Sequence, residues 1–389
     1  MFKRVAFALA ALAMLGLSGC MHPGRVPAVT VADAAEPTVL GLPNARFYID
    51  TDVALMQEEG AKSVQREFAA LRLRPGAPLP PARFLALSGG GDDGAFGAGL
   101  LVGWTATGRR PSFKIVTGIS TGALIAPFAF LGSDYDGVLR AVYTETSQKD
   151  IFTPRMVFAA LTNDAMSDTT PLYRMISRYV DANLMARIAK EYRKGRLLLI
   201  ATTNLDAGRP VIWNIGAIAN SGHPQAIETI KRILLASASI PGAFPPVMFD
   251  VDVNGVPRQE MHVDGGAVAQ VFLYPPTISV KGGPKRKREA YIIRNGRFSV
   301  PWTTVDRQTL SIAGRAVNTM ITSNGIGDLY RIYATTQRDG VDFNLAVIGP
   351  DFTVPYKTPF EQSYMRALFN YGYEAAIAGY KWRKTPPGL

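Results

Sequence analysis

The pentapeptide Gly-Ile-Ser-Thr-Gly at residues 118–122 has the residue types and spacing needed for covalent catalysis. An apolar run at 113–117 precedes it and predicts a strand, and a helical pattern begins after Thr121. A strand, a sharp turn and a helix are the context in which Gly-x-Ser-x-Gly acts as a nucleophile elbow. The two glycines avoid side-chain clashes around the strained serine backbone. The motif therefore predicts that Ser120 is a nucleophile exposed above the end of a strand.

A second glycine-rich segment, residues 88–99 (Ser-Gly-Gly-Gly-Asp-Asp-Gly-Ala-Phe-Gly-Ala-Gly), also joins a predicted strand to a predicted helix. Consecutive glycines can point backbone N–H groups into one small space, and the helix dipole adds positive potential. Such a nest suits a phosphate or the oxyanion of an acyl-transfer intermediate. The lysine of a phosphate-binding loop is missing. A dinucleotide-binding site requires an acidic residue about twenty positions after the glycines, where this chain has Arg109 and Arg110. An oxyanion hole that works with Ser120 fits better.

The general base has three candidates. Of the three histidines, His22 lies in the N-terminal segment, which leaves His223 or His262 for a Ser-His-Asp triad. The other candidate is Asp264, at the end of a predicted strand and followed by two glycines. A carboxylate can deprotonate serine directly if a short hydrogen bond joins them and partial loss of water raises its pKa. The residues alone leave the choice open, although His262 is expected to be structural.

An alternation of short apolar runs and helical patterns, which starts near Arg83, must position these segments. Strands that alternate with helices predict an α/β fold with a largely parallel sheet. The expected strands are 84–87, 113–117, 197–203, one around Trp213, one that ends at 262–263, 291–294 and 345–348. The expected helices are 52–71, 95–105, one after Thr121, one after 170–171, 225–237 and two near the C-terminus.

The first twenty residues predict a targeting signal. Lys3 and Arg4 precede a short apolar run, which ends in small residues, as in secretory signals. Leu-Ser-Gly-Cys at 17–20 resembles a bacterial lipobox, which implies that Cys20 becomes the lipidated first residue of the mature chain. By resemblance to enterobacterial sorting, Met21 favours the outer over the inner membrane. The predicted location is the bacterial cell envelope, lipid-anchored and facing the periplasm or the surface.

The composition narrows the classes of function. Apolar residues make up 47% of the chain and charged residues 19%, which argues against global disorder. No apolar run approaches the roughly 18 residues that a membrane-spanning helix needs. The net charge of +11 could suit nucleic acid, but a lipoprotein outside the cytoplasm rarely meets it. Anionic phospholipid headgroups are the expected partner.

The two glycine motifs and the Asp-Gly-Gly at 264–266 occur in the order and rough spacing of patatin-like phospholipases. Residues 237–247 (Ser-Ala-Ser-Ile-Pro-Gly-Ala-Phe-Pro-Pro-Val) are also similar to the segment that precedes that family's aspartate. The chain resembles this family over about residues 83 to 270. The resemblance implies a three-layer α/β/α sandwich with a central, largely parallel sheet, which hydrolyses acyl esters of lipids without a metal or cofactor.

Carried over to this sequence, the resemblance implies a Ser-Asp dyad in which Ser120 is the nucleophile and Asp264 the base. It also implies an oxyanion hole built from the backbone N–H groups of Gly90, Gly91 and Asp92. One position departs from the family, which usually has Arg or Lys where this chain has Asp93. A carboxylate beside a developing oxyanion would oppose it unless it is turned away. Asp93 is expected instead to cap the following helix.

The sequence thus predicts a lipoprotein signal peptide at 1–19, an N-terminal tether and helix at 20–80, and a patatin-like hydrolase domain at 81–389. The predicted function is that of a lipid acyl hydrolase that forms an acyl-serine intermediate. Its expected partners are a phospholipid or other lipid ester and a membrane surface reached through lipidated Cys20, not nucleic acid.

Two alternatives remain open from the sequence. The nearer one is a Ser-His-Asp esterase that acts on soluble esters through His223 or His262. The other is a non-catalytic lipid-binding lipoprotein of the envelope, for which Asp93 is the best support.

Overall fold

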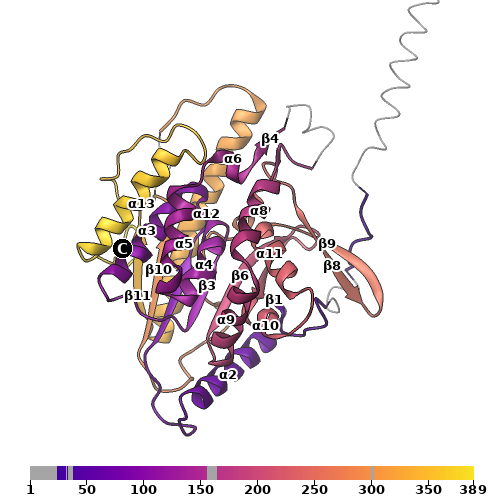
Figure 1. The fold of residues 1–389 in the computed structure, drawn as a ribbon, viewed down its shortest axis with the longest axis vertical. Helices are drawn as coiled ribbons and strands as arrows, with labels where there is room; N and C mark the ends of the chain where they lie inside the picture. The colour runs from indigo at the N-terminus through magenta and orange to yellow at the C-terminus, as the bar shows by residue number, and fades with distance from the viewer. Residues whose placement is uncertain (1–23, 32, 34–37, 156–163, 299–301) are drawn as a thin grey trace, which may run out of the picture.

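A mixed sheet with helices on both faces forms the body of the computed structural model (Figure 1). The structure describes residues 24–31, 33, 38–155, 164–298 and 302–389, and over these residues the sheet has nine strands. Its main path runs β1-β7-β6-β3-β2-β10-β11, and all neighbours from β6 to β11 are parallel. The strands are β1 (Arg46–Tyr48), β2 (Ala82–Leu87), β3 (Ile115–Gly118), β6 (Leu197–Asn204), β7 (Arg209–Asn214), β8 (Val247–Val253), β9 (Val256–Asp264), β10 (Arg288–Arg294) and β11 (Asp342–Val347), with β4 (Thr153–Pro154) and β5 (Ser167–Asp168) paired separately.

The helices fill the connections between these strands. The α-helices are α2 (Val53–Ala70), α3 (Gly94–Ala106), α4 (Thr121–Leu131), α5 (Asp136–Thr144), α6 (Gln148–Ile151), α8 (Thr170–Tyr179), α9 (Ala182–Arg193), α10 (Ile215–Asn220), α11 (Ala226–Ser237), α12 (Thr309–Asp339) and α13 (Gln362–Ile377). Short 3-10 turns are η2 (Gly91–Asp93), η3 (Ser133–Tyr135) and η4 (Gly265–Ala267).

Strand β2 shows how the sheet separates two cores. Because side chains alternate along a strand, Leu85 and Leu87 join the large core beneath α3, α4 and α13, whereas Phe84 faces the other way. Phe84 lies in a smaller core that Leu329 and Ile332 of α12 complete. Helices therefore cover both faces of the sheet, and the predicted three-layer α/β/α fold is confirmed.

The expected strands and helices are present within a few residues of their predicted bounds. Helices α5, α6, α9 and α10 and strands β1, β4, β5 and β8 were not predicted from the sequence. Strand β1 is only three residues long and lies within residues 20–80, which were predicted to form a tether and a helix, yet it pairs antiparallel with β7. Before it, the Val26 N–H donates to the Gln259 side chain and the Gln259 N–H donates to the Pro27 carbonyl. Part of the predicted N-terminal tether is therefore bound along β9.

The predicted signal peptide, Cys20 and His22 lie outside the described residues. The targeting and lipidation predictions therefore stay predictions. Within the part of the chain that the structure describes, no helix combines the length and apolar character required to cross a bilayer.

Helix α3 is held by an unusually close contact with α13. A Cβ added at Gly99 would lie 2.0 Å from the Phe369 carbonyl oxygen, so only glycine permits this approach. Phe369 is fully buried, and Trp382 packs against Trp104 of α3. Late aromatic residues thus fix α3, whose first turns belong to the glycine-rich segment.

Candidate active site

The sheet brings Ser120 and Asp264 together through strand β6. Gly118, the last residue of β3, pairs with Ile200 of β6, and Asp264, the last residue of β9, pairs with Thr202. Strand β7 occupies the other edge of β6 at these positions. Because β3 is parallel and β9 antiparallel to β6, the two strands approach each other end to end along one edge. Ser120 follows one of these ends and Asp264 forms the other.

The Ser120 hydroxyl interacts with the Asp264 carboxylate and favours its charged form. Both residues are buried, with 7% and 4% of their surface exposed. Ser120 has φ 55° and ψ −125°, a backbone conformation that residues other than glycine rarely adopt. Its N–H donates to Ser237 Oγ over 3.0 Å, and a Cβ added at Gly122 would lie 2.3 Å from the Leu87 carbonyl oxygen. The predicted strand-turn-helix elbow is therefore present, and packing from α11 and β2 holds its strained turn. The prediction that Ser120 is exposed is wrong, because the surrounding elements bury it.

The surroundings of Asp264 tune it as a base. Burial raises the pKa of Asp264 to about 7, although hydrogen bonds from the Ser120 hydroxyl and the Gly266 N–H favour the charged form. The Gly266 N–H donates to Asp264 Oδ1 over 2.7 Å. A carboxylate with this pKa can exchange a proton with a reacting group near neutral pH.

The glycine-rich loop lies directly against the serine. A Cβ added at Gly89 would come within 3.2 Å of Ser120 Cβ. The Gly90 N–H has no acceptor in the described part of the chain, and Gly91 opens η2, whose first N–H groups are unused inside a helix. Asp92 follows Gly91 in the same turn. The loop thus presents backbone donors beside Ser120, at the start of α3.

Two polar residues that the sequence analysis missed hold this loop. The Asn295 N–H and side-chain amide donate to Ser88 Oγ and Ser88 O, each over 2.8 Å, and Asn295 Oδ1 accepts from the Gly97 N–H. The Gln270 side chain donates to the Gly266 carbonyl over 2.9 Å, and the Gln270 backbone carbonyl accepts from the Gly89 N–H. The available signal for Asn295 was its position directly after a predicted parallel strand.

The prediction that Asp93 caps α3 is wrong. Asp93 occupies the N-cap position in a helical conformation and makes no side-chain cap hydrogen bond. Its carboxylate instead accepts from the Tyr364 hydroxyl of α13 over 2.7 Å, because α13 packs so closely on α3. Burial raises the pKa of Asp93 to about 6.

The neighbouring Asp92 carboxylate accepts from the Phe360 N–H over 2.8 Å and from the Tyr356 hydroxyl, and burial raises its pKa. The carboxylates of Asp92 and Asp93 therefore bind the C-terminal segment.

His262 is built into a buried network. Its Nε2 lies 3.1 Å from Glu260 Oε2, and its Nδ1 lies 2.9 Å from Thr202 Oγ1. A carboxylate can only accept, so Nε2 carries the proton and Nδ1 accepts from the threonine. Burial lowers the pKa of His262. The ring has no free nitrogen for Ser120, which agrees with the structural role expected of this histidine.

Arg46 of β1 completes the network by pairing with Glu260, with Nη2 and Oε1 3.0 Å apart. Burial alone would raise the pKa of Glu260, but the hydrogen bond from His262 and the charge of Arg46 lower it to about 2. The sequence analysis placed Arg46 in the N-terminal tether and helix at 20–80 and singled out neither residue. Strand β9, which ends at Asp264, is thus tied to the N-terminal segment by a buried ion pair.

Replacing Arg46 with alanine is expected to lower the free energy of unfolding by about 3–5 kcal/mol, because it leaves Glu260 buried without its cation. Urea unfolding at pH 7 measures this change. Arg209 is the matched control, since it also lies over the Tyr48 ring but pairs with an exposed Asp50, so Arg209→Ala should cost about 1 kcal/mol or less. The stabilisation should be present above pH 4.5 and be lost as the pH falls towards 2, since folding lowers the pKa of Glu260. Equal effects of the two substitutions would contradict this account.

His223 lies at the far end of a helix from the serine. It precedes α11, and its Nδ1 accepts from the Gln225 N–H over 3.1 Å. The other end of α11 carries Ser237, which contacts Ser120. The helix between them has 12 residues and is about 18 Å long at a rise of 1.5 Å per residue. His223 is therefore not brought to the site.

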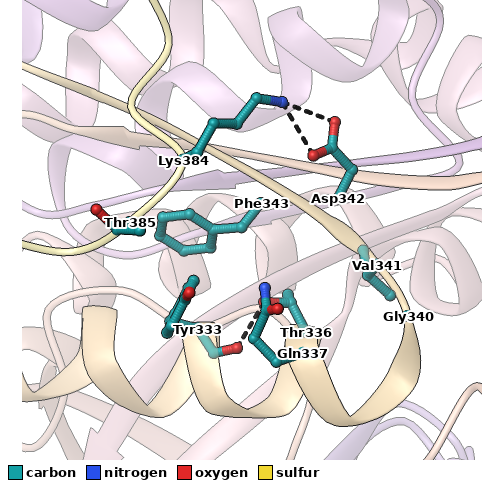
Figure 2. A pocket seen from close by; sticks show the side chains of 9 residues that line it. All are labelled: Tyr333, Thr336, Gln337, Gly340, Val341, Asp342, Phe343, Lys384 and Thr385. Atoms are coloured by element: carbon teal, nitrogen blue, oxygen red, sulfur yellow. Dashed lines mark hydrogen bonds and ion pairs between the residues drawn. The ribbon is translucent and has the colours of Figure 1, made fainter. Parts of the chain in front are cut away.

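A wide hollow of about 610 Å³ lies elsewhere on the surface, between the end of α12 and the start of β11 (Figure 2). Lys384 and Asp342 form an ion pair across it. Asp342 begins β11, whereas Ser120 follows the carboxyl end of β3, so the hollow and the serine lie at opposite edges of parallel strands. Among the described residues, no group of three or more His, Cys, Asp or Glu side chains could hold a metal ion.

The sequence model of the patatin-like phospholipase family matches residues 85–275. This match includes Ser120, Asp264 and the glycine-rich loop. A comparison with curated proteins found no match.

The solved structures similar to the chain include VipD from Legionella pneumophila, human GIVD cytosolic phospholipase A2 and the type III effector protein ExoU. Their sequence identities are 12%, 11% and 14%, and their TM-scores are 0.34, 0.32 and 0.28. The matches cover 76%, 80% and 77% of this chain, but 66%, 56% and 53% of those proteins. The chain thus spans less than two thirds of the length of each.

Proposed function

Because residues 85–275 belong to the patatin-like phospholipase family, we propose that the chain hydrolyses carboxylic esters of lipids through a Ser120–Asp264 dyad. The observation that carries the proposal is that the ends of β3 and β9 meet along β6, which places the Ser120 hydroxyl beside the buried Asp264 carboxylate and within its electrostatic influence. The strained elbow and the adjacent glycine-rich loop support it.

In the first half of the reaction, the Asp264 carboxylate takes the Ser120 proton as Oγ attacks the ester carbonyl carbon. The N–H groups of Gly90, Gly91 and Asp92 donate to the oxygen on which negative charge develops. As the tetrahedral intermediate collapses, protonated Asp264 gives its proton to the leaving alcohol or lysolipid. An acyl group remains on Ser120.

In the second half, water enters where the alcohol left. Asp264 removes a proton from the water as its oxygen attacks the acyl carbon, and the same backbone donors stabilise the second intermediate. The proton returns to Ser120 Oγ and the fatty acid leaves. The helices α3 and α4 both begin at this site, so the positive ends of their dipoles favour the oxyanion in each step.

The two carboxylates in the loop are compatible with this chemistry. Asp93 binds the Tyr364 hydroxyl and Asp92 binds the Phe360 N–H, so both are directed to the C-terminal segment. Because Asp93 is bound to Tyr364, it gives no support to a non-catalytic lipoprotein.

Substrate class and base can be tested together. The chain is expected to release fatty acid from mixed phosphatidylcholine and phosphatidylglycerol vesicles and to hydrolyse p-nitrophenyl butyrate. His223→Ala and His262→Gln should stay within about tenfold of the unmodified chain, because neither histidine is placed to accept the Ser120 proton. A loss of about a thousandfold in either would favour the Ser-His-Asp esterase. Hydrolysis of the soluble ester alone would refute a lipid substrate.

The location remains a prediction from residues 1–20. We propose a lipid-anchored protein of the bacterial cell envelope, held through acylated Cys20, with lipid esters rather than nucleic acid as its partner. Metabolic labelling with a fatty-acid analogue, beside Cys20→Ala, tests the anchor.

A further inference from the structure

The first half of α12 lies largely outside the packed body of the protein. Side chains from Ile312 to Met320 are exposed or half-exposed, whereas burial begins around Gly325 and includes Leu329. Figure 1 shows the beginning of this orange helix at the top of the molecule. A helix half with so few tertiary contacts gains little stability from packing.

This exposed half is amphipathic. At about 100° per residue, one face carries the apolar residues and the other the polar ones. The apolar face consists of Ile312, Ala313, Ala316, Val317, Met320 and Ile321. The opposite face consists of Ser311, Gly314, Arg315, Asn318, Thr319 and Thr322. Ile312, Val317 and Met320 are each more than half exposed, so nothing in the described structure covers the apolar face.

The segment before the helix adds an aromatic residue. Trp302 is fully exposed, which is unusual for so large a side chain. Tryptophan is favoured at the boundary between lipid and water, where its ring lies among the headgroups. Within the described residues, an exposed tryptophan thus precedes an uncovered apolar helix face.

The charges favour an anionic surface. From Arg307 to Gly327 the sequence has no acidic residue, and Arg315 belongs to the polar face. The whole chain carries +11, so a second copy would be repelled while anionic headgroups would be attracted.

The exposed half also lies at the edge of the sheet that carries the dyad. A Cβ added at Gly325 would lie 2.2 Å from Nη1 of Arg294, the last residue of β10, so α12 meets the carboxyl edge there. One turn later, Asp328 accepts from the Gln270 N–H over 2.6 Å, and the Gln270 side chain binds Gly266. The helix then descends to the amino end of β11. About 24 Å of helix before Gly325 therefore extends beyond the edge at which Ser120 lies.

We propose that Trp302 and the apolar face of α12 from Ile312 to Ile321 form a docking surface for a bilayer that contains anionic phospholipid. The apolar face enters the headgroup and acyl boundary while Arg315 stays at headgroup level. The proposal rests on the proposed function, since it explains how a buried serine receives an ester from a membrane. It is separate from the acylated Cys20, which lies at the other end of the chain.

The test compares two charge-matched variants in the full chain carrying Ser120→Ala and Cys20→Ala, so that neither hydrolysis nor acylation contributes. Val317→Asp/Met320→Asp places two carboxylates on the apolar face, and Asn318→Asp/Thr319→Asp places two on the polar face. In flotation with equimolar phosphatidylcholine and phosphatidylglycerol vesicles, the apolar-face variant should bind at least about tenfold more weakly than its parent. The polar-face variant should bind at least about threefold more tightly than the apolar-face variant. All four residues are exposed, and circular dichroism checks that the variants fold.

A second measurement follows Trp302 itself. Vesicles with brominated acyl chains should quench tryptophan emission in the parent, and Trp302→Phe should remove most of that quenching. Equal binding by the two charge variants would overturn the proposal, as would quenching that survives Trp302→Phe. A dimer that the apolar-face variant converts to monomer without loss of vesicle binding would overturn it in favour of a second copy. Because binding is measured without catalysis, failure of the hydrolase proposal would show separately, as an unmodified chain inert towards p-nitrophenyl butyrate.

Discussion

Replacing Ser120 with alanine is expected to lower kcat/KM for ester hydrolysis by at least about 10⁴-fold, on vesicles and on p-nitrophenyl butyrate alike. Without Oγ no acyl-serine can form, and water would have to attack the ester directly from a site shaped for a side-chain nucleophile. The same substitution should abolish labelling by a fluorophosphonate, which reacts with an activated serine. Initial rates and labelling intensity measure the two effects.

Ser239→Ala is the matched control for this substitution. Ser239 is also fully buried near the site, and its hydroxyl donates to the Leu235 carbonyl over 2.9 Å. Its backbone carbonyl accepts from the Asp264 N–H, a contact that alanine keeps. Activity within a fewfold of the parent is expected. If Ser120→Ala and the parent were equally inert and equally unlabelled, a lipid-binding role without catalysis would replace the hydrolase proposal.

Replacing Asp264 with asparagine is expected to lower kcat by about 10²- to 10⁴-fold, the range that a general base contributes. Asparagine keeps the shape and can still accept from Gly266, but it cannot take the proton from Ser120. In the unmodified chain, burial raises the pKa of Asp264 to about 7. Since only the carboxylate acts as a base, kcat/KM should rise with pH through about 7 and fall about tenfold per unit below it.

The stability of Asp264→Asn separates catalysis from folding. Between about pH 4 and 7 the unfolded chain releases this proton while the folded chain keeps it. The free energy of unfolding therefore falls by up to about 1.4 kcal/mol per pH unit as the pH rises. Asparagine carries no such cost, so the variant should be at least as stable as the parent at pH 8 in urea unfolding. An inactive variant that is also much less stable would point to a structural role, and a variant with unchanged kcat and pH profile would exclude Asp264 as the base.

Local sequence determined the elbow and the glycine-rich loop. In each case the strand, the motif and the helix follow one another directly in the chain (115–131 and 82–106), so the backbone conformation follows from neighbouring residues. The same holds for α12, whose exposed half already has its amphipathic period in the sequence. The order of strands and helices, and hence the α/β fold, was predictable for a similar reason, since apolar periodicity is a property of short windows.

The choice of Asp264 over His223 or His262 was not local. The choice depends on β3 and β9 pairing with successive parts of the same edge of β6. This pairing brings together residues that are far apart in the sequence. His262 shares a strand with Asp264, but contacts with Thr202 and Glu260 occupy its ring. From the residues alone the three candidates were open, and only the family resemblance favoured the aspartate.

The partners of the buried charged side chains also could not be predicted from the sequence. Asp93 is of a residue type that often caps a helix, and it directly precedes α3. Tyr364 of α13 nevertheless binds it, because α13 packs tightly on the glycines of α3. Arg46 lies in a segment that indicated a tether, yet it neutralises Glu260 on β9. The sequence by itself therefore determined which residues could do chemistry, since motifs act over short windows. Only the tertiary structure decided which side chains meet, because a buried polar group binds whichever partner the packing of distant elements brings to it.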